Sequence, residues 1–146
     1  MALSPILLAD DDADQAFLTT RAFKTAGVEH PLVVVRDGSA AIDYLAGKGP
    51  HADRAAHPLP CLMLLDQKLP GCSGLEVLQW VRSESPVCTL PVLLLSSSNF
   101  DGDVQAAYLL GANGYLVKPA SFEETLAMAR AIKEYWLNFN RAPSPG

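Results

Sequence analysis

The chain has 146 residues, enough for one domain with a sizeable hydrophobic core, and its 49% apolar and 18% charged residues exclude an intrinsically disordered protein. Its net charge of −5 argues against a nucleic-acid-binding protein, because such proteins neutralise phosphates with clustered basic residues. No apolar run approaches the roughly 20 residues that cross a bilayer, so we expect no membrane partner.

The N-terminal residues and the cysteines bear on cellular location. The first five residues lack the basic start and the long apolar core of a signal peptide. Cys61, Cys72 and Cys88 are an odd set without metal-binding spacing, which predicts free thiols in a reducing compartment. We therefore expect a cytoplasmic protein.

Five short apolar runs alternate with amphipathic segments along the chain. Runs of this kind, bounded by glycine, proline and aspartate, are typical of strands buried on both faces of a parallel sheet. The predicted strands are Ile6–Ala9, Leu32–Val35, Cys61–Asp66, Val92–Leu95 and Tyr115–Val117. The five predicted helices bury, in chain order, Leu18, Ala22 and Ala26; Ile42 and Leu45; Leu75, Leu78 and Val81; Val104, Ala107 and Tyr108; and Phe122, Leu126, Ala129, Ile132 and Trp136. This alternation predicts an α/β fold, a doubly wound five-stranded parallel sheet with helices on both faces.

Capping residues indicate where several helices begin. Ser73 and Glu76 fit a capping box, and Ser121 and Glu124 suggest a second one. Asp101 is expected to cap the helix between the fourth and fifth strands.

Residues 47–60, rich in Gly, Pro, Ala and His, are predicted to form a loop that is mobile or serves as a contact surface. They are not a domain boundary, because too little chain lies on either side for two cores. His30, His51 and His57 all lie in predicted loops and are expected on the solvated surface. Residues 1–140 are therefore expected to form one domain, followed by a disordered tail at 141–146.

Polar side chains stand at the ends of four predicted strands. Asp10 and Asp11 follow the first strand, Asp66 ends the third, Ser96 follows the fourth and Lys118 follows the fifth. These ends meet at one edge of a parallel sheet, where such folds bind ligands. Three neighbouring carboxylates repel one another unless a cation joins them, and Mg²⁺ suits carboxylate, water and phosphate oxygens. A carboxylate beside Mg²⁺, a lysine and a hydroxyl can attack a phosphoryl group.

Each piece has a simpler interpretation when taken alone. The acidic residues 10–12 fit an exposed helix start, residues 96–98 fit a polar loop, and Lys118-Pro119 fits a plain turn. Their joint occurrence at four strand ends is much harder to explain by chance.

Four segments together carry a resemblance to a known family. They are Ala9-Asp10-Asp11, Leu64-Leu65-Asp66 with Leu69-Pro70-Gly71, Pro91 through Ser96, and Gly111 through Pro119. From roughly Ile6 to Leu137 the sequence resembles the receiver domain of a two-component response regulator, which implies a CheY-like, flavodoxin-like (βα)5 fold with strand order 2-1-3-4-5. The long loop before the third strand, residues 96–98 and the last helix with Trp136 are most similar to single-domain regulators that partner bacterial phytochrome kinases.

The resemblance implies a role for each residue of the strand-end cluster. Asp66 would be the phosphoacceptor, taking the phosphoryl group from the phosphohistidine of a sensor histidine kinase. Mg²⁺, with Mn²⁺ as the alternative ion, would be bound by Asp11, by Asp66 and by the main-chain carbonyl of Lys68, with Asp10 acting through a water. Lys118 would pair with Asp66 or with its phosphate.

The resemblance also implies a conformational switch. Ser96 would move to hydrogen-bond a phosphate oxygen, and Tyr115 would change rotamer with it. Ser96 stands where the family more often has threonine, so it keeps the hydroxyl but has a freer rotamer. Pro119 would follow a cis peptide bond that aims Lys118 into the cleft.

The implied partners are a sensor histidine kinase, of the phytochrome type by the narrower resemblance, and a downstream protein or phosphotransfer partner, because the chain ends where an effector linker would begin. The last two helices and the fifth strand, with Tyr135, are the expected contact face, and a homodimer through that face is left open. As a signalling domain, the chain would catalyse only its own phosphorylation and dephosphorylation.

Three other functions are weighed against this one. An aspartyl-phosphate phosphatase or phosphotransferase would need a second aspartate where Lys68 stands. A flavodoxin-like cofactor binder would need a phosphate-cradling loop after the first strand, where this chain has three acids. A degenerate receiver that acts only as a binding module is disfavoured by the intact set of Asp11, Asp66, Ser96 and Lys118.

Overall fold

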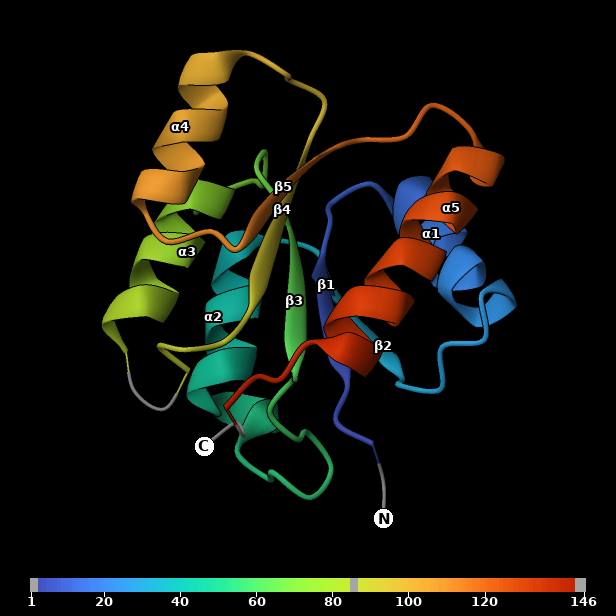
Figure 1. Ribbon diagram of the computed structural model, residues 1–146. Helices are drawn as coiled ribbons and strands as arrows, with labels where there is room; N and C mark the ends of the chain where they lie inside the picture. Colours follow the sequence, from blue (N-terminus) through green and yellow to red (C-terminus); the bar gives the residue numbers. More distant parts are fainter. Residues whose placement is uncertain (1–2, 85–86, 144–146) are drawn as a thin grey trace.

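A five-stranded parallel sheet forms the centre of the computed structural model, which describes residues 3–84 and 87–143 (Figure 1). The strands are β1 (Ile6–Ala9), β2 (Leu32–Val35), β3 (Leu62–Asp66), β4 (Val92–Ser96) and β5 (Gly114–Val117). Their order is β2-β1-β3-β4-β5, which confirms the predicted fold and strand order. The order reverses between β1 and β3, the switch point at which doubly wound sheets bind ligands.

The central strands are apolar, apart from Asp66 and Ser96 at the ends of β3 and β4, because both of their faces are covered. Every residue of β1, β3 and β4 is buried, whereas the edge strand β5 is partly exposed along its length. In register, Ala9 of β1 lies beside Leu65 of β3, and Asp66 lies beside Leu95 of β4. The strand ends therefore fall level with one another at one edge of the sheet.

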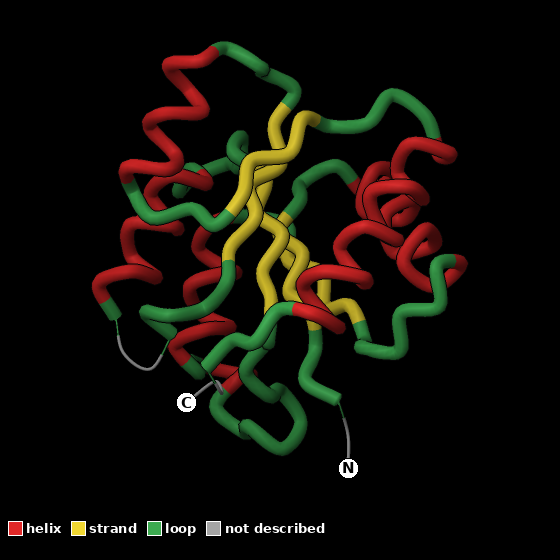
Figure 2. The backbone as a smooth tube through the Cα atoms, viewed as in Figure 1, coloured by secondary structure: helices red, strands yellow, loops and turns green. Residues whose placement is uncertain are grey.

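Five helices cover the sheet in two layers. They are α1 (Ala13–Thr25), α2 (Gly38–Ala46), α3 (Gly74–Ser83), α4 (Asp101–Leu109) and α5 (Phe122–Glu134). Helices α1 and α5 lie together on one face, and α2, α3 and α4 lie on the other (Figures 1 and 2). The buried side chains accordingly form two clusters, one on each side of the sheet.

The predicted helix starts are only partly confirmed. Ser73 and Glu76 form the complete capping box at α3. At α5, Ser121 accepts from the Glu124 amide, but the Glu124 carboxylate turns to the amide of Ala120, so the reciprocal half is absent there. The expectation for Asp101 is wrong: it is the first residue of α4, after an N-cap position that makes no side-chain cap bond.

In two helices the buried face is only partly the one predicted, with Ala22 and Ala107 buried as expected. In α1 the buried residues are Ala16, Thr19, Ala22 and Phe23, while Leu18 is only half-buried. In α4 Ala107 is buried as expected, but Tyr108 is 50% exposed. Apolar residues stand on more than one side of both helices, so periodicity alone did not select the buried side.

Residues 47–60 form a packed lobe and contain a 3-10 turn, η1 (Gly49–His51). The Arg54 guanidinium donates to the main-chain carbonyls of Tyr44 and Leu45, at the end of α2, and to that of His57. The Tyr44 hydroxyl donates to the carbonyl of Pro58, and the rings of His51 and His57 pack on Tyr44. The two loop histidines are therefore half-buried, contrary to the expectation of solvated side chains.

The chain continues past α5 in a π-helical turn, η2 (Tyr135–Phe139). Residues 141–143 are exposed, and the rest of the predicted tail, 144–146, lies outside the described residues. In the part of the chain that the structure describes, no helix combines the length and apolar character that crossing a membrane requires.

Candidate functional site at the carboxyl ends of the strands

The polar residues predicted to meet do lie at one edge of the sheet, at the top in Figure 1. Asp10 follows β1, Asp66 ends β3, Ser96 ends β4 and Lys118 follows β5. Asp10, Ser96 and Asp66 are each at most 3% exposed. Parallel strands alone explain this convergence, since all of them deliver their last residue to the same side.

Three carboxylates form a compact cluster. One oxygen from each of Asp10, Asp11 and Asp66 lies within 4.8 Å of the others. Two of the three residues are buried, so water screens their mutual repulsion poorly. The cluster therefore requires compensating positive charge.

Lys118 supplies part of that charge. Its Nζ lies 2.8 Å from Oδ2 of Asp66, and the main-chain amide of Lys68 donates to Oδ1 of the same carboxylate at 3.0 Å. Burial by itself lowers the pKa of Lys118, but the hydrogen bond and charge of Asp66, with Asp10 and Asp11 behind it, outweigh burial and raise that pKa. Lys118 is thus held as a cation.

Asp10 has a buried carboxylate oxygen without a hydrogen-bond partner. Its Oδ1 accepts from the amide of Asp12, but its Oδ2 is buried and has no hydrogen-bond partner. Burial, supported by the charges of Asp66 and Asp12, raises the pKa of Asp10 above its ordinary value of 3.8. A buried, unpartnered carboxylate oxygen beside two further carboxylates fits a hard divalent cation, directly or through a water.

A glycine brings the start of α3 against the end of β3. The Gly74 amide donates to the carbonyl of Gln67, and a Cβ at position 74 would lie 2.3 Å from the carbonyl oxygen of Asp66. Any side chain there would displace the main chain that carries Asp66. Gly74 was placed in the capping segment by sequence, but its contact with Asp66 was not foreseen.

Ser96 and Tyr115 are joined through the loop between β4 and α4. The Ser96 hydroxyl accepts from the amide of Ser98 at 3.1 Å. The Tyr115 hydroxyl lies 3.0 Å from the carbonyl of Ser98 and 3.1 Å from Oε1 of Gln67. The Ser98 hydroxyl in turn donates to Asp103 in the first turn of α4 at 2.7 Å. Sequence reasoning did not include Gln67 in the site, because a single glutamine after a strand matches no motif.

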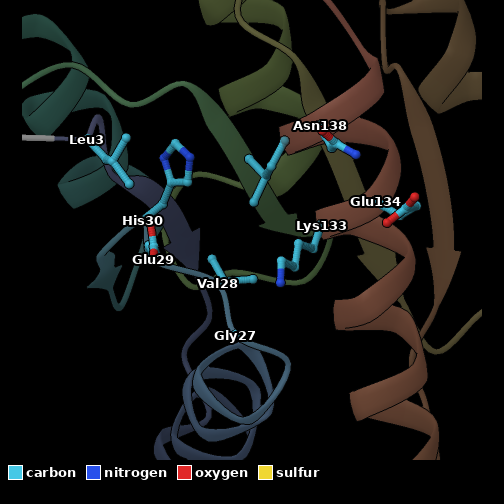
Figure 3. A pocket seen from close by; sticks show the side chains of 9 residues that line it. Leu3, Gly27, Val28, Glu29, His30, Lys133, Glu134 and Asn138 are labelled. Carbon is cyan, nitrogen blue, oxygen red and sulfur yellow. The ribbon is translucent and has the colours of Figure 1, made fainter.

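A pocket of about 410 Å³ lies at another place in the fold, between the segment after α1 and the end of α5 (Figure 3). Val28, His30, Lys133 and Asn138 are among its lining residues. None of the clustered carboxylates lines it, so it is separate from the site at the strand ends.

Divalent cations are expected to stabilise the protein through this cluster. At 100 times its Kd, Mg²⁺ should raise the free energy of unfolding by about 2.7 kcal/mol. Because the pKa of Asp10 is raised in the fold, its contribution to stability is complete below 3.8 and is lost as pH rises through the raised value. Asp10→Asn should therefore stabilise the metal-free protein at pH 7 and weaken the response to Mg²⁺.

Urea unfolding in EDTA and in Mg²⁺ measures both effects. The control is Asp43→Asn, an exposed carboxylate on α2, which should leave the Mg²⁺ response unchanged. An Asp10→Asn variant as responsive to Mg²⁺ as the parent would contradict the assignment of this cluster.

A carboxylate that is ion-paired with lysine and set among further carboxylates thus lies at the switch point of a doubly wound sheet, where such folds bind ligands. The response regulator receiver domain family matches residues 6–130. The chain belongs to this family. As a response regulator receiver, it takes part in two-component signalling by accepting a phosphoryl group.

Several known proteins are similar over nearly the whole chain. The probable methanogenesis regulatory protein FilR2 of Methanothrix harundinacea is 39% identical, covering 96% of this chain and 88% of the relative. The phosphorylated cyanobacterial phytochrome response regulator RcpA is 34% identical, with a TM-score of 0.90 and coverage of 98% and 100%. Response regulator Rcp1 of Synechocystis sp. is similar in its Mn²⁺-bound structure, at 32% identity and a TM-score of 0.86, with coverage of 97% and 100%.

Proposed function

We propose that Asp66 is the residue that accepts the phosphoryl group. The observation that carries this is its setting: a buried carboxylate at the end of β3, paired with Lys118 at 2.8 Å and clustered with Asp10 and Asp11. No other acidic residue predicted for the site has a cationic side chain so placed.

In the transfer, an oxygen of the Asp66 carboxylate forms a bond to phosphorus as the bond from phosphorus to the donor breaks. With a phosphohistidine donor, the electron pair of the P–N bond stays on the imidazole, which takes up a proton. Lys118 faces the charge that develops on the phosphoryl oxygens. The chain catalyses this step and the later hydrolysis only on itself, so it is a signalling domain and not an enzyme with an external substrate.

Mg²⁺ is the proposed cofactor, with Mn²⁺ able to replace it, as the Mn²⁺-bound structure of Rcp1 supports. Asp11 and Asp66 would hold the ion directly, together with the main-chain carbonyl of Lys68. Asp10, whose Oδ2 is buried without a partner, would act through a water. The bound ion would neutralise charge on the phosphoryl oxygens during transfer.

Ser96 and Tyr115 are the proposed switch. The Ser96 hydroxyl accepts from the amide of Ser98, and it would turn towards a phosphate on Asp66. The carbonyl of the same residue, Ser98, accepts from the hydroxyl of Tyr115. A change at Ser96 therefore alters the environment of Tyr115. Two alternative arrangements of one hydrogen-bonded loop are what a phosphorylation switch requires.

The proposed phosphodonor is a sensor histidine kinase of the phytochrome type, which the similarity to the phytochrome response regulator RcpA supports. Output would pass to a downstream protein or a further phosphotransfer partner. The proposed contact face is formed by α4, β5 and α5, where Tyr108, Val117 and Tyr135 are each about half exposed. The same face could pair two copies of the chain.

Intact-mass spectrometry after incubation with acetyl phosphate and Mg²⁺ tests the central step. The parent should gain one adduct of about 80 Da that hydroxylamine removes, as expected for an acyl phosphate. Asp66→Asn, and the parent in EDTA, should gain none, while the control Asp43→Asn should behave as the parent. A full adduct on Asp66→Asn, or none on the folded parent with several phosphodonors, would contradict the proposal.

A further inference from the structure

The side chain of Gln67 bridges the strand that carries Asp66 and the loop that carries the switch. Its Oε1 lies 3.1 Å from the hydroxyl of Tyr115, a residue 48 positions later on the edge strand β5. No motif places a glutamine here, and the proposed phosphotransfer does not use it. The contact is therefore an unassigned part of the site.

The main chain of Gln67 is fixed on both sides. Its amide donates to the carbonyl of Leu95 at 3.0 Å, and its carbonyl accepts from the amide of Gly74 at 3.0 Å. The first bond ties Gln67 to the neighbouring strand β4, and the second ties it to the start of α3. Its side chain consequently extends from a rigid base, one residue beyond Asp66.

The second partner of Tyr115 is a less fixed one. The carbonyl of Ser98 belongs to the β4–α4 loop and accepts from Tyr115. The amide of the same residue donates to the hydroxyl of Ser96. A tyrosine hydroxyl has one proton to donate, so it cannot donate fully to both carbonyl oxygens at once. An amide can also donate, so a rotation of the Gln67 amide would let it donate to the phenol oxygen while Tyr115 donates to Ser98.

We infer that Gln67 is a positioning residue that holds the Tyr115 side chain inward and couples the exit of β3 to the β4–α4 loop. In this role the Gln67 side chain contacts neither the phosphoryl group nor the carboxylates proposed to bind the metal. When the loop moves at Ser98, Gln67 is the second contact through which Tyr115 and the exit of β3 respond together. This inference rests on the proposed function for its link to phosphorylation, but the packing of Tyr115 can be measured without it.

The test is ¹⁹F NMR of protein labelled with 3-fluorotyrosine, in which the Tyr115→Phe variant identifies the Tyr115 resonance. Gln67→Met keeps the length of the side chain and removes both hydrogen-bonding groups. The solvent isotope shift of the Tyr115 fluorine between H₂O and D₂O should rise about two-fold, towards those of the half-exposed Tyr108 and Tyr135, because the inner anchor of the phenol is lost. The matched control is Gln79→Met, an exposed glutamine on α3, which should leave the resonance unchanged.

The same samples are then treated with acetyl phosphate and Mg²⁺, and their masses are measured. Phosphorylation should move the Tyr115 resonance of the parent, and Gln67→Met should form the same adduct with a Tyr115 response that is about halved. A Tyr115 resonance in Gln67→Met that matches the parent before and after phosphorylation would overturn the role of Gln67. Absence of any adduct on the parent would overturn the proposed function instead, while the comparison of unphosphorylated samples would still decide the role of Gln67.

Discussion

Replacing Arg82 by methionine is expected to lower the free energy of unfolding by about 3 to 4 kcal/mol, which is a large fraction of the stability of a domain this size. Arg82 lies near the end of α3, and its Nε donates to the carbonyl of Gly111 at 2.9 Å. Nη1 donates to the carbonyls of Leu90 at 2.7 Å and Cys88 at 3.2 Å, and Nη2 to the side chain of Asn113 at 2.8 Å. One guanidinium thus joins α3 to the segments that lead into β4 and β5.

The cost follows from what the substitution leaves behind. Methionine fills much of the same volume, but several carbonyl oxygens lose their charged donor in a partly buried place. Burial already lowers the pKa of Arg82, so the protein holds this cation despite a desolvation penalty. Arg82→Lys should recover only a minor part of the loss, because an ammonium cannot reproduce the fork of donors.

Urea unfolding measures this prediction, and thermal unfolding should show a midpoint lowered by about 10 °C. The control Arg130→Met changes an exposed arginine on α5 and should alter stability by no more than about 0.5 kcal/mol. A loss below about 1 kcal/mol for Arg82→Met would mean that water replaces the guanidinium at these carbonyls.

The sheet and the composition of the site could be predicted because both depend on short-range patterns. Residues 62–65 are all apolar since helices cover both faces of the strand, and that continuity separates a central parallel strand from an amphipathic one. Parallel strands then bring Asp10, Asp66 and Lys118 to one edge without any knowledge of loop structure.

The features that escaped prediction depend on contacts between distant residues. Arg82 and Gly111 are 29 positions apart, and Gln67 and Tyr115 are 48 apart, so no local pattern records either pair. The start of α4 is a local exception: its N-cap position, Phe100, makes no side-chain cap bond, and Asp103 accepts from the hydroxyl of Ser98, five positions earlier, in a contact that no capping pattern describes.

The contacts of residues 47–60 were also not predictable from their composition. Their composition predicted a loop that is mobile or serves as a contact surface, and the structure adds that Arg54 donates to carbonyls at the end of α2 while the Tyr44 hydroxyl of α2 donates to the carbonyl of Pro58. Composition does not predict that a single arginine donates to the carbonyls at a helix end, because arginine is usually a surface residue.

Removing the lysine of the site is expected to have the largest effect on phosphorylation short of removing Asp66. Lys118→Met should slow adduct formation from acetyl phosphate by about 100-fold, the cost of losing one oriented charge that faces the transferring oxygens. It should also lower the free energy of unfolding at pH 7 by about 3 kcal/mol, because the Asp66 carboxylate, only 3% exposed, is left unpaired.

The pH dependence of stability separates this explanation from a simple packing defect. The pKa of Lys118 is raised in the fold, so its contribution is complete below the ordinary value of 10.5 and is lost only as pH rises through the raised one. The parent should therefore show no change from this group between about pH 5 and 8. In Lys118→Met the loss of stability that the parent shows as pH rises through the raised pKa of Lys118 should be absent.

A double-mutant cycle with Asp66→Asn completes the argument. Once Asp66 is an uncharged amide, Lys118→Met should cost at least about 1.5 kcal/mol less than it does in the parent, because no buried carboxylate is left without a partner. Lys48→Met, at an exposed position in the 47–60 loop, is the control for losing one positive charge, and it should alter neither the rate nor the stability appreciably. Equal costs of Lys118→Met in the two backgrounds, or a rate within about three-fold of the parent, would show that the ion pair does not organise this site.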